Sequence, residues 1–397
     1  MILKLAWRNL IGGGFRTWLN VFILSVVIVT IIGFHGMYIG WQKDGENGII
    51  KWHVAGGQYW QNNYDPYDSF SYDESRQMMP ASVPDENAVE FLVGQGVIYP
   101  QGRMKNITLK GVEEEQGLLE LPTQLLAYEP GRYKMMMGHR TARKLKLNEG
   151  DRLMLRWRNS TGSFDATSFE IVKIFKTTVS SKDQGQVWLG IQQMREMFGI
   201  MQEVNYFTVR EPVEGLGKSW EFKSQDKLLS EFRALISAKI AGGMFMYALL
   251  MFLAMIAVFD TQVLSLFKRR KEVGMMMAIG LNREQIIRIF TWEGFIGGLL
   301  SVALAVIWGT PLLLKFQENG LRLPEFMNSF GVDGIIDAMY PQYTISLVIF
   351  TIVIVLLIML AVSYIPVSNI SRLTPVDALQ GRMTISVKRK KSMLSNR

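Results

Sequence analysis

The sequence has no cysteine among its 397 residues, which excludes disulfides, zinc–thiolate sites and a cysteine nucleophile. It has only three histidines, and their spacing fits no metal-ligand pattern. The phosphate-binding pattern G-x-x-x-x-G-K-[ST] and the nucleophile pattern G-x-S-x-G are also missing. We therefore expect no catalytic residue, no metal and no directly bound cofactor, and no ATP hydrolysis by this chain alone.

Charged side chains are missing from four long windows, at 17–42, 240–259, 294–314 and 344–366. About 20 apolar residues at 1.5 Å rise each cover the roughly 30 Å hydrocarbon core of a bilayer. Lipid requires every backbone polar group to be satisfied within the segment, so we interpret all four windows as transmembrane helices. The first is longer than the apolar part of a signal peptide and lacks a small-x-small cleavage site, so we expect it to be retained.

The net charge of +8 is distributed unevenly along the chain. Residues 1–16 carry three basic and no acidic residues, and residues 268–291 carry six basic and two acidic residues. The tail after Pro366 carries seven basic residues and one acidic residue. By contrast, 41–239 has 25 basic and 26 acidic residues, and 317–342 has one and four. Since Lys and Arg collect in cytoplasmic connections, both termini and the 268–291 loop are predicted to be cytoplasmic. The basic balance is thus typical of membrane orientation rather than of nucleic-acid binding.

These windows and connections define eight segments. In order they are a cytoplasmic start with helix one (1–42), an extracytoplasmic domain (43–239), helix two (240–267), a cytoplasmic loop (268–291), helix three (292–316), a short outer loop (317–342), helix four (343–367) and a basic cytoplasmic tail (368–397).

The outer domain shows both strand and helix periodicity. Strands are predicted at 107–112, 152–157, 169–175 and 204–210, and short helices at 138–147 and 191–198. The domain is therefore predicted to be α+β.

The stretch 268–294 has apolar residues at helical spacing with charges between them, and a break near 280–282. It is predicted to be an amphipathic element beside the bilayer. One interpretation is a juxtamembrane helix that only anchors the span through its Lys and Arg residues. The pattern alone leaves this interpretation and a functional one equally open.

Several motifs, in this order, resemble the FtsX-like permeases, the membrane subunits of the ABC transporter class that includes MacB and the lipoprotein-releasing permeases. In the loop they are Arg269-x-x-Glu272-Val273-Gly274 and Ala278-Ile279-Gly280, followed by Ile286 and Glu293. Outside the loop, residues 5–21 resemble the family's entry into helix one, and residues 107–113, 135–155 and 169–199 resemble its MacB-type outer core. The family's closing segment is resembled by Ser371-Arg372-Leu373-Thr374-Pro375-Val376-Asp377-Ala378-Leu379.

The resemblance implies a membrane protein with four transmembrane helices and a MacB-like α+β domain between helices one and two. It also implies a coupling helix in the loop that docks in a groove of a separate ATPase subunit, which would hold ATP and Mg²⁺. At one coupling position this chain has Met277, where the family often has a basic residue. The residues to which the resemblance assigns the coupling are Arg269, Glu272, Val273, Gly274, Met277, Ala278 and Gly280.

Four residues in or near the spans have separate interpretations. Asp260 is ionisable within a span, which by default indicates function, but its closeness to Lys268 favours a structural ion pair or helix-end role. Glu293 is placed at the start of helix three near the headgroups, in a coupling or helix-end role. Gly294 and Gly298 form a small-xxx-small pair that fits packing within one subunit, with dimerisation as the alternative.

The expected function is that of a permease subunit in the inner (cytoplasmic) membrane. It would couple ATP hydrolysis by a separate ATPase to motion of the outer domain, and so release lipoproteins or export peptides or amphipathic compounds. Its partners would be that ATPase, a second identical or paralogous permease, and an outer substrate or effector protein, with no nucleic acid. The alternative is FtsX-like signalling that activates a cell-wall hydrolase without transport. A receptor is disfavoured because the chain has no kinase, cyclase or methyl-accepting module.

Overall fold

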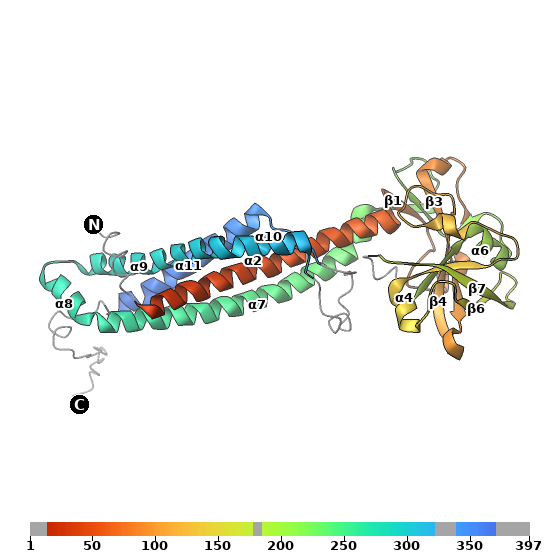
Figure 1. Cartoon of the computed structure of the whole chain (residues 1–397). Coiled ribbons are helices and arrows are strands. Elements are labelled where there is room, and N and C mark those ends of the chain that lie inside the picture. The colour runs from red at the N-terminus through yellow and green to blue at the C-terminus, as the bar shows by residue number, and fades with distance from the viewer. Residues whose placement is uncertain (1–13, 178–184, 322–338, 371–397) are drawn as a thin grey trace, which may run out of the picture. The chain divides into compact units, whose positions relative to one another are not determined.

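The computed structural model describes residues 14–177, 185–321 and 339–370 (Figure 1). Its contacts divide the chain into two compact units. Of these residues, the helical unit contains 14–39, 239–321 and 340–370, and the sheet unit contains 40–177, 185–238 and Met339. The closing segment 371–379 and most of the short outer loop lie outside the described residues.

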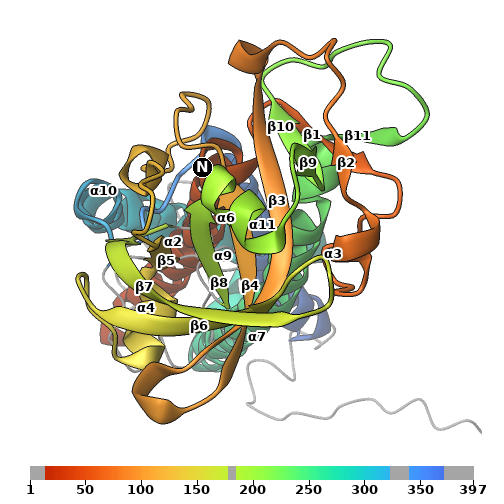
Figure 2. The same cartoon turned by 90° about the vertical axis from the view of Figure 1, so that its right-hand side faces the viewer.

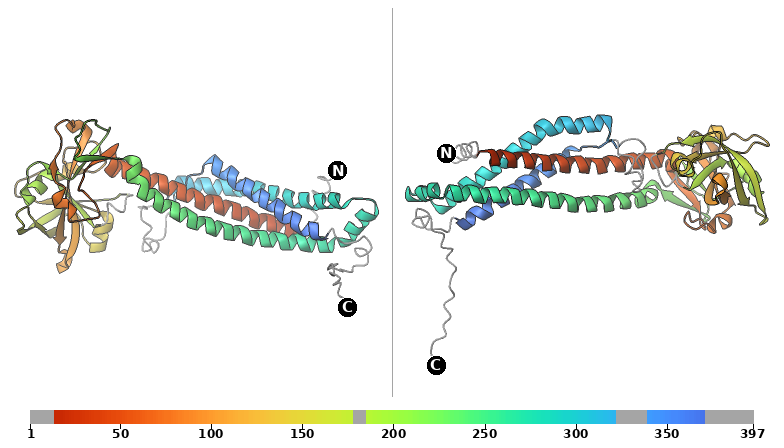
Figure 3. Two further views of the ribbon diagram at one scale, coloured as in Figure 1. Left: turned by 180° about the vertical axis from the view of Figure 1, so that it is seen from behind. Right: turned by 60° about the horizontal axis from the view of Figure 1, so that its bottom comes forward.

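Four long helices build the helical unit and run side by side in the views of Figures 1 and 3. Each is long and apolar enough to cross a membrane, with mean hydropathy between 1.9 and 3.3 in its most apolar window. They are α2 (Phe15–Ile49), α7 (Gln225–Lys268), α9 (Arg283–Leu304), which continues through the π-helix η5 (Ala305–Gly309) into α10 (Thr310–Asn319), and α11 (Ile345–Ile370).

The four helices share an apolar core, but they are covered unequally. Inside lie residues such as Ile28 from α2, Val258 from α7 and Val355 from α11, each at most 5% exposed. In α2, 39% of the most apolar window is buried, against 11% in α7. Because the outward residues of α7, such as Phe252, are large and apolar, this face is suited to lipid or to another apolar surface.

The helices are longer than the charge-free windows that predict them. Helix α7 begins at Gln225, well before residue 240, and α9 begins at Arg283 instead of residue 292. In the added part of α7, Leu229 and Ile236 are buried at helical spacing while Asp226, Lys227 and Glu231 are exposed. This stretch is thus an amphipathic helix within the sheet unit, which a search for uncharged windows does not detect.

Nine strands form the main sheet, in the order β11-β1-β10-β3-β4-β8-β5-β7-β6, and an additional pairing joins β3 to β6 (Figure 2). That pairing closes the six strands from β3 to β6 into a ring. The strands are β1 (Gly57–Gln61), β3 (Ala88–Ile98), β4 (Lys105–Val112), β5 (Lys134–Gly138), β6 (Arg152–Arg158), β7 (Phe164–Phe175), β8 (Gln186–Gly190), β10 (Tyr206–Val209) and β11 (Trp220–Ser224), with β2 (Gln77–Met78) and β9 (Glu203–Val204) as a separate pair.

Short helical segments complete the sheet unit. They are η1 (Ile50–Val54), α3 (Ser71–Glu74), η2 (Asp85–Asn87), η3 (Pro100–Gly102), η4 (Thr123–Leu126), α4 (His139–Leu145) and α6 (Ile191–Phe198). The strands and helices predicted from periodicity are present, so the α+β fold and the four-helix membrane class are confirmed.

Apolar side chains from both the ring and α6 form the larger core of the sheet unit. Phe198 and Met194 of α6 pack against Gly94 in β3, where a Cβ atom would lie 2.4 Å from the Phe198 ring. Trp157 of β6 donates its indole N–H to the Met197 carbonyl at 2.7 Å. The helix is therefore held on the ring by close packing and a buried hydrogen bond, without disulfides.

The chain enters and leaves the sheet unit through two neighbouring strands. Gly57, at the start of β1, pairs with Ser224, at the end of β11, and the two strands are antiparallel. Just beyond them, α2 and α7 are joined by an ion pair between Glu46 Oε2 and Arg233 Nη2 at 3.0 Å. The ring of Phe232 also packs against Gly45, where no Cβ would fit.

Candidate functional site

A short helix connects two of the long helices at one end of the helical unit (Figure 1). Helix α7 ends at Lys268, Arg269 leaves the helical conformation, and α8 (Arg270–Ala278) follows. The predicted break lies at 279–282, between α8 and α9. The 268–291 loop is therefore mostly helical, and its last part forms the first turns of α9.

The inner face of α8 is part of a small apolar core that includes the ends of three long helices. Val273 of α8 is 6% exposed, and Met277 packs beside it. The cluster joins them to Leu266 of α7, Ile286, Ile287 and Phe290 of α9, Val367 of α11, and Leu281 of the turn. Arg283 also donates to the Ser368 carbonyl of α11 at 3.0 Å. Helix α8 is therefore packed into the end of the bundle.

The turn from α8 to α9 is specified by consecutive capping signals. The N–H groups of Gly280 and Leu281 donate to the carbonyls of Met277 and Met276 at 3.1 and 3.0 Å, the Schellman pattern of a helix C-terminus. Gly280 has φ +104°, which favours glycine. The next residue, Asn282, donates its backbone N–H to Gln285 Oε1 at 2.9 Å and begins α9.

Replacing Gly280 with alanine should loosen this turn. No atom lies within 4 Å of the position a Cβ would occupy, so the cost comes from the backbone conformation alone, about 1–2 kcal/mol. Amides 280 and 281 should then exchange with deuterium about tenfold faster in the full chain. Gly242→Ala is the matched control, because it also points into open space but lies inside α7 without a positive φ. Equal exchange in Gly280→Ala and the wild type would contradict this account.

The outer face of α8 ends in exposed apolar side chains. Met275 is 54% exposed and Ile279, four residues later, is 76% exposed, with exposed Ala278 on the same face. The charged residues Lys271 and Glu272 lie exposed one turn earlier on this side. An apolar centre with a charged rim on a packed element is typical of a protein-docking surface.

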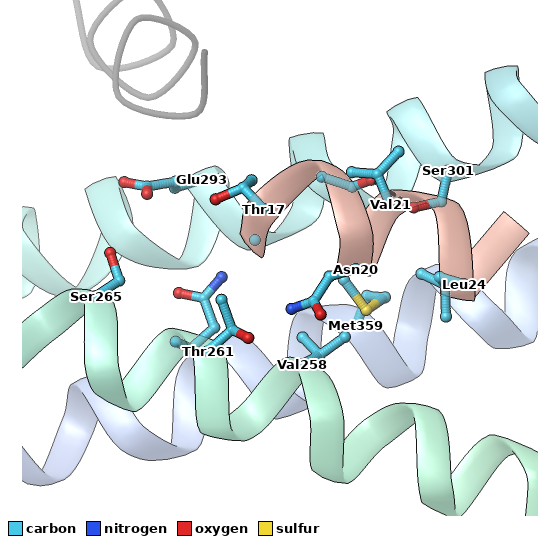
Figure 4. A pocket seen from close by; sticks show the side chains of 13 residues that line it. Thr17, Asn20, Val21, Leu24, Val258, Thr261, Ser265, Glu293, Ser301 and Met359 are labelled. Carbon is cyan, nitrogen blue, oxygen red and sulfur yellow. Dashed lines mark hydrogen bonds between the residues drawn. The ribbon is translucent and has the colours of Figure 1, made fainter. Parts of the chain in front are cut away.

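A buried ion pair lies behind α8. Arg269 Nη1 is 3.2 Å from both carboxylate oxygens of Glu293 on α9, and the two side chains are 17% and 9% exposed. Glu293 lines a cavity of about 40 Å³ whose wall has both polar and apolar side chains (Figure 4). The other polar residues are Thr17 and Asn20 of α2, Thr261, Gln262 and Ser265 of α7, and Ser301 of α9, and the apolar side chains are Val21, Leu24, Val258 and Met359.

The seven residues predicted for coupling fall into separate groups. Val273 and Gly274 are buried and Met277 is half-buried in the apolar core, so these three build α8 into the bundle. Arg269 pairs with Glu293. The remaining three, Glu272, Ala278 and Gly280, are exposed.

Sequence reasoning missed the two large apolar residues of the outer face, Met275 and Ile279. The signal that could have found them is their i, i+4 spacing on the face opposite Val273 and Met277.

Two predictions for ionisable residues need correction. Glu293 was expected at the start of helix three without forced burial, but it lies ten residues into α9 and is 7% exposed, because its partner Arg269 lies next to it. Asp260 is exposed on α7, and no ion pair with Lys268 is present among the side chains that the structure describes.

The two glycines of α9 both contact α11 of the same chain. A Cβ on Gly294 would lie 1.8 Å from Ser363 Oγ, so the helices touch there at backbone distance. A Cβ on Gly298 would lie 3.3 Å from Leu356 and 3.4 Å from Met359. In this structure the small-xxx-small pair thus contacts a helix of its own chain.

The comparison with protein families matches residues 244–375 to the C-terminal region of the FtsX-like permeases. A curated relative, an uncharacterized ABC transporter permease (MJ1507) of Methanocaldococcus jannaschii, is 20% identical over 274 residues. The match covers 63% of each protein, so the chain spans less than two thirds of that relative.

Two solved structures show a weaker likeness. The periplasmic region of MacB from Actinobacillus actinomycetemcomitans matches 45% of this chain and 92% of its own length, with 7% identity and a TM-score of 0.27. The extracellular domain of the noncanonic ABC-type transporter YknZ from Gram-positive bacteria matches 42% of this chain and 99% of its own length, with 11% identity and a TM-score of 0.26.

Proposed function

We propose, from the premise that this chain is an FtsX-like permease, that it is the membrane subunit of an ABC transporter driven by a separate ATPase that docks on α8. The observation that carries this proposal is the exposed pair Met275 and Ile279 on a helix whose other face is packed into the bundle. Helix α8 is in contact with three of the long helices. A partner that displaced α8 would therefore directly change how these three helices pack.

The energy would have to come from the partner. The sequence has no P-loop, so ATP and Mg²⁺ would be bound and hydrolysed in the ATPase subunit. In such a scheme the chain's part is mechanical. It would receive a displacement at α8 and pass it along helices that also contribute residues to the sheet unit, α2 and α7.

The cargo would be handled outside the bundle. Ligand pockets usually enclose about 300–1,000 Å³, whereas the cavity beside Glu293 has about 40 Å³. A lipoprotein, peptide or other amphipathic compound does not fit such a space. We therefore propose that the sheet unit, on the outer side of the inner membrane, acts on a substrate already there, and that a second permease, identical or paralogous, completes the assembly.

Orientation and partner can be tested on one tagged full-length chain. Because the wild type has no cysteine, single cysteines at Arg288, which is exposed and outside the proposed docking surface, and at Met154 can be labelled without background. An impermeant maleimide applied to intact cells should label position 154 of the sheet unit, and position 288 only after lysis. Purification in detergent should bring an ATPase in stoichiometric amount, and the chain alone should hydrolyse no ATP. Labelling of both positions from outside, or purification without an ATPase, would overturn the proposal.

A further inference from the structure

The ion pair between Arg269 and Glu293 lies at the junction of α7, α8 and α9. Arg269 is the residue between α7 and α8, and Glu293 is in the third turn of α9. A buried pair of this kind adds little stability over well-packed apolar residues of the same size. Its clearest effect is therefore geometric, since two hydrogen bonds from one guanidinium nitrogen fix where α8 begins relative to α9.

The contact of α2 with this junction is of a different kind. Thr17 and Asn20 face Thr261, Gln262 and Glu293 across the cavity, as Figure 4 shows for the labelled residues. Asn20 Nδ2 reaches the Ala257 carbonyl only at 3.5 Å. A space of about 40 Å³ with polar groups on three helices is large enough for water, which can bridge such groups in more than one arrangement. Val21 and Leu24 of α2 also line this space, and this apolar part of the contact resists a shift of α2 more strongly than the polar part does.

We propose that Arg269 and Glu293 are a positioning pair that makes α9 follow α8, and that the polar contact beside them is where α2 shifts against both. The inference rests on the proposed function, because the displacement of α8 would come from the ATPase. Both residues act through helices and touch neither nucleotide nor cargo. We expect the cavity to bind water, hydrogen-bonded to hydroxyl, amide and carboxylate groups of three helices.

The first test uses the full chain alone in nanodiscs, with spin labels at Met275→Cys on α8 and Leu299→Cys on α9, both exposed sites. Glu293→Gln and Arg269→Gln should broaden the distance distribution between the labels at least twofold. The exchanged pair Arg269→Glu/Glu293→Arg, or the conservative Arg269→Lys where the exchange does not fold, should restore a narrow distribution. Arg288→Gln is the matched control, since its pair with Glu284 is exposed and 3.9 Å long. An unchanged distribution in Glu293→Gln would overturn the inference.

The second test adds the ATPase, with the labels at Leu299→Cys on α9 and Leu19→Cys on α2, both exposed and away from the docking surface. Glu293→Gln should bind the ATPase within about twofold of the wild type, because the outer face of α8 is untouched. The ATP-dependent change in distance between these two labels should fall at least tenfold, because α9 no longer follows α8. A variant that loses binding, or one that keeps the full distance change, would overturn the inference. Failure of the proposed function looks different, since the wild type would then bind no ATPase while the result on the isolated chain stands.

Discussion

Replacing Met275 and Ile279 together with glutamate should release the ATPase from the full-length chain. Both side chains are more than half exposed, so the bundle does not need them, and both would lie at the centre of the proposed interface. Central apolar contacts each contribute about 2 kcal/mol or more to binding, and new charges there would be desolvated without partners. We expect binding to weaken at least about 100-fold, roughly 2.7 kcal/mol, in a titration in detergent.

The matched control changes exposed methionines of the sheet unit. Met104 is 66% and Met154 is 55% exposed, comparable to Met275, and neither belongs to the helical unit. The double variant Met104→Glu/Met154→Glu should bind the ATPase as the wild type does. If Met275→Glu/Ile279→Glu still binds normally while folded, the outer face of α8 is not the docking surface.

Gly294→Ala should destabilise the helical unit strongly, and more than Gly298→Ala in the same helix. The new Cβ would lie 1.8 Å from Ser363 Oγ and 2.5 Å from its Cβ, and a serine side chain is too short to move away. Helices α9 and α11 must then separate, at a cost of about 3 kcal/mol. Thermal unfolding of the full chain in detergent should shift down by roughly 5–10 °C.

Two further variants test whether the contact of position 294 with Ser363 causes the loss of stability. Gly298→Ala, one turn further along α9, should be tolerated because its nearest neighbours would be 3.3 Å away or more. Removing the opposing side chain in Gly294→Ala/Ser363→Gly should restore most of the lost stability. A Gly294→Ala protein that unfolds with the wild type would show that α9 and α11 do not meet there.

Local patterns predicted the elements whose bounds depend on nearby residues. The helix at 191–198 was placed correctly because Gly190 and Gly199 flank it and its apolar residues follow one face. The break at 279–282 was equally visible, since Gly280 and Asn282 are residues that end and begin helices.

Features that depend on distant partners could not be predicted in this way. Burial of Glu293 depends on Arg269, which no local periodicity pairs with it. The closure of the ring depends on β3 meeting β6 more than 50 residues later. The family motif also brought buried and exposed residues of α8 together as one coupling set, because a motif does not say which face the bundle covers. Which face of α8 is buried depends on its packing against Phe290 and Val367, which lie on two other helices.

The pairing of Gly57 with Ser224 has a consequence for how the sheet unit withstands force. Tension arriving through α2 or α7 enters β1 or β11 at the same end of two adjacent strands. A pull that spreads α2 and α7 would open the β1–β11 hydrogen bonds one after another from that end, whereas a pull on both helices together along the strands would load the ladder between β1 and β10 in shear. The sheet unit, which has no covalent cross-link, is therefore attached so that it withstands a common pull better than a separation of the two helices.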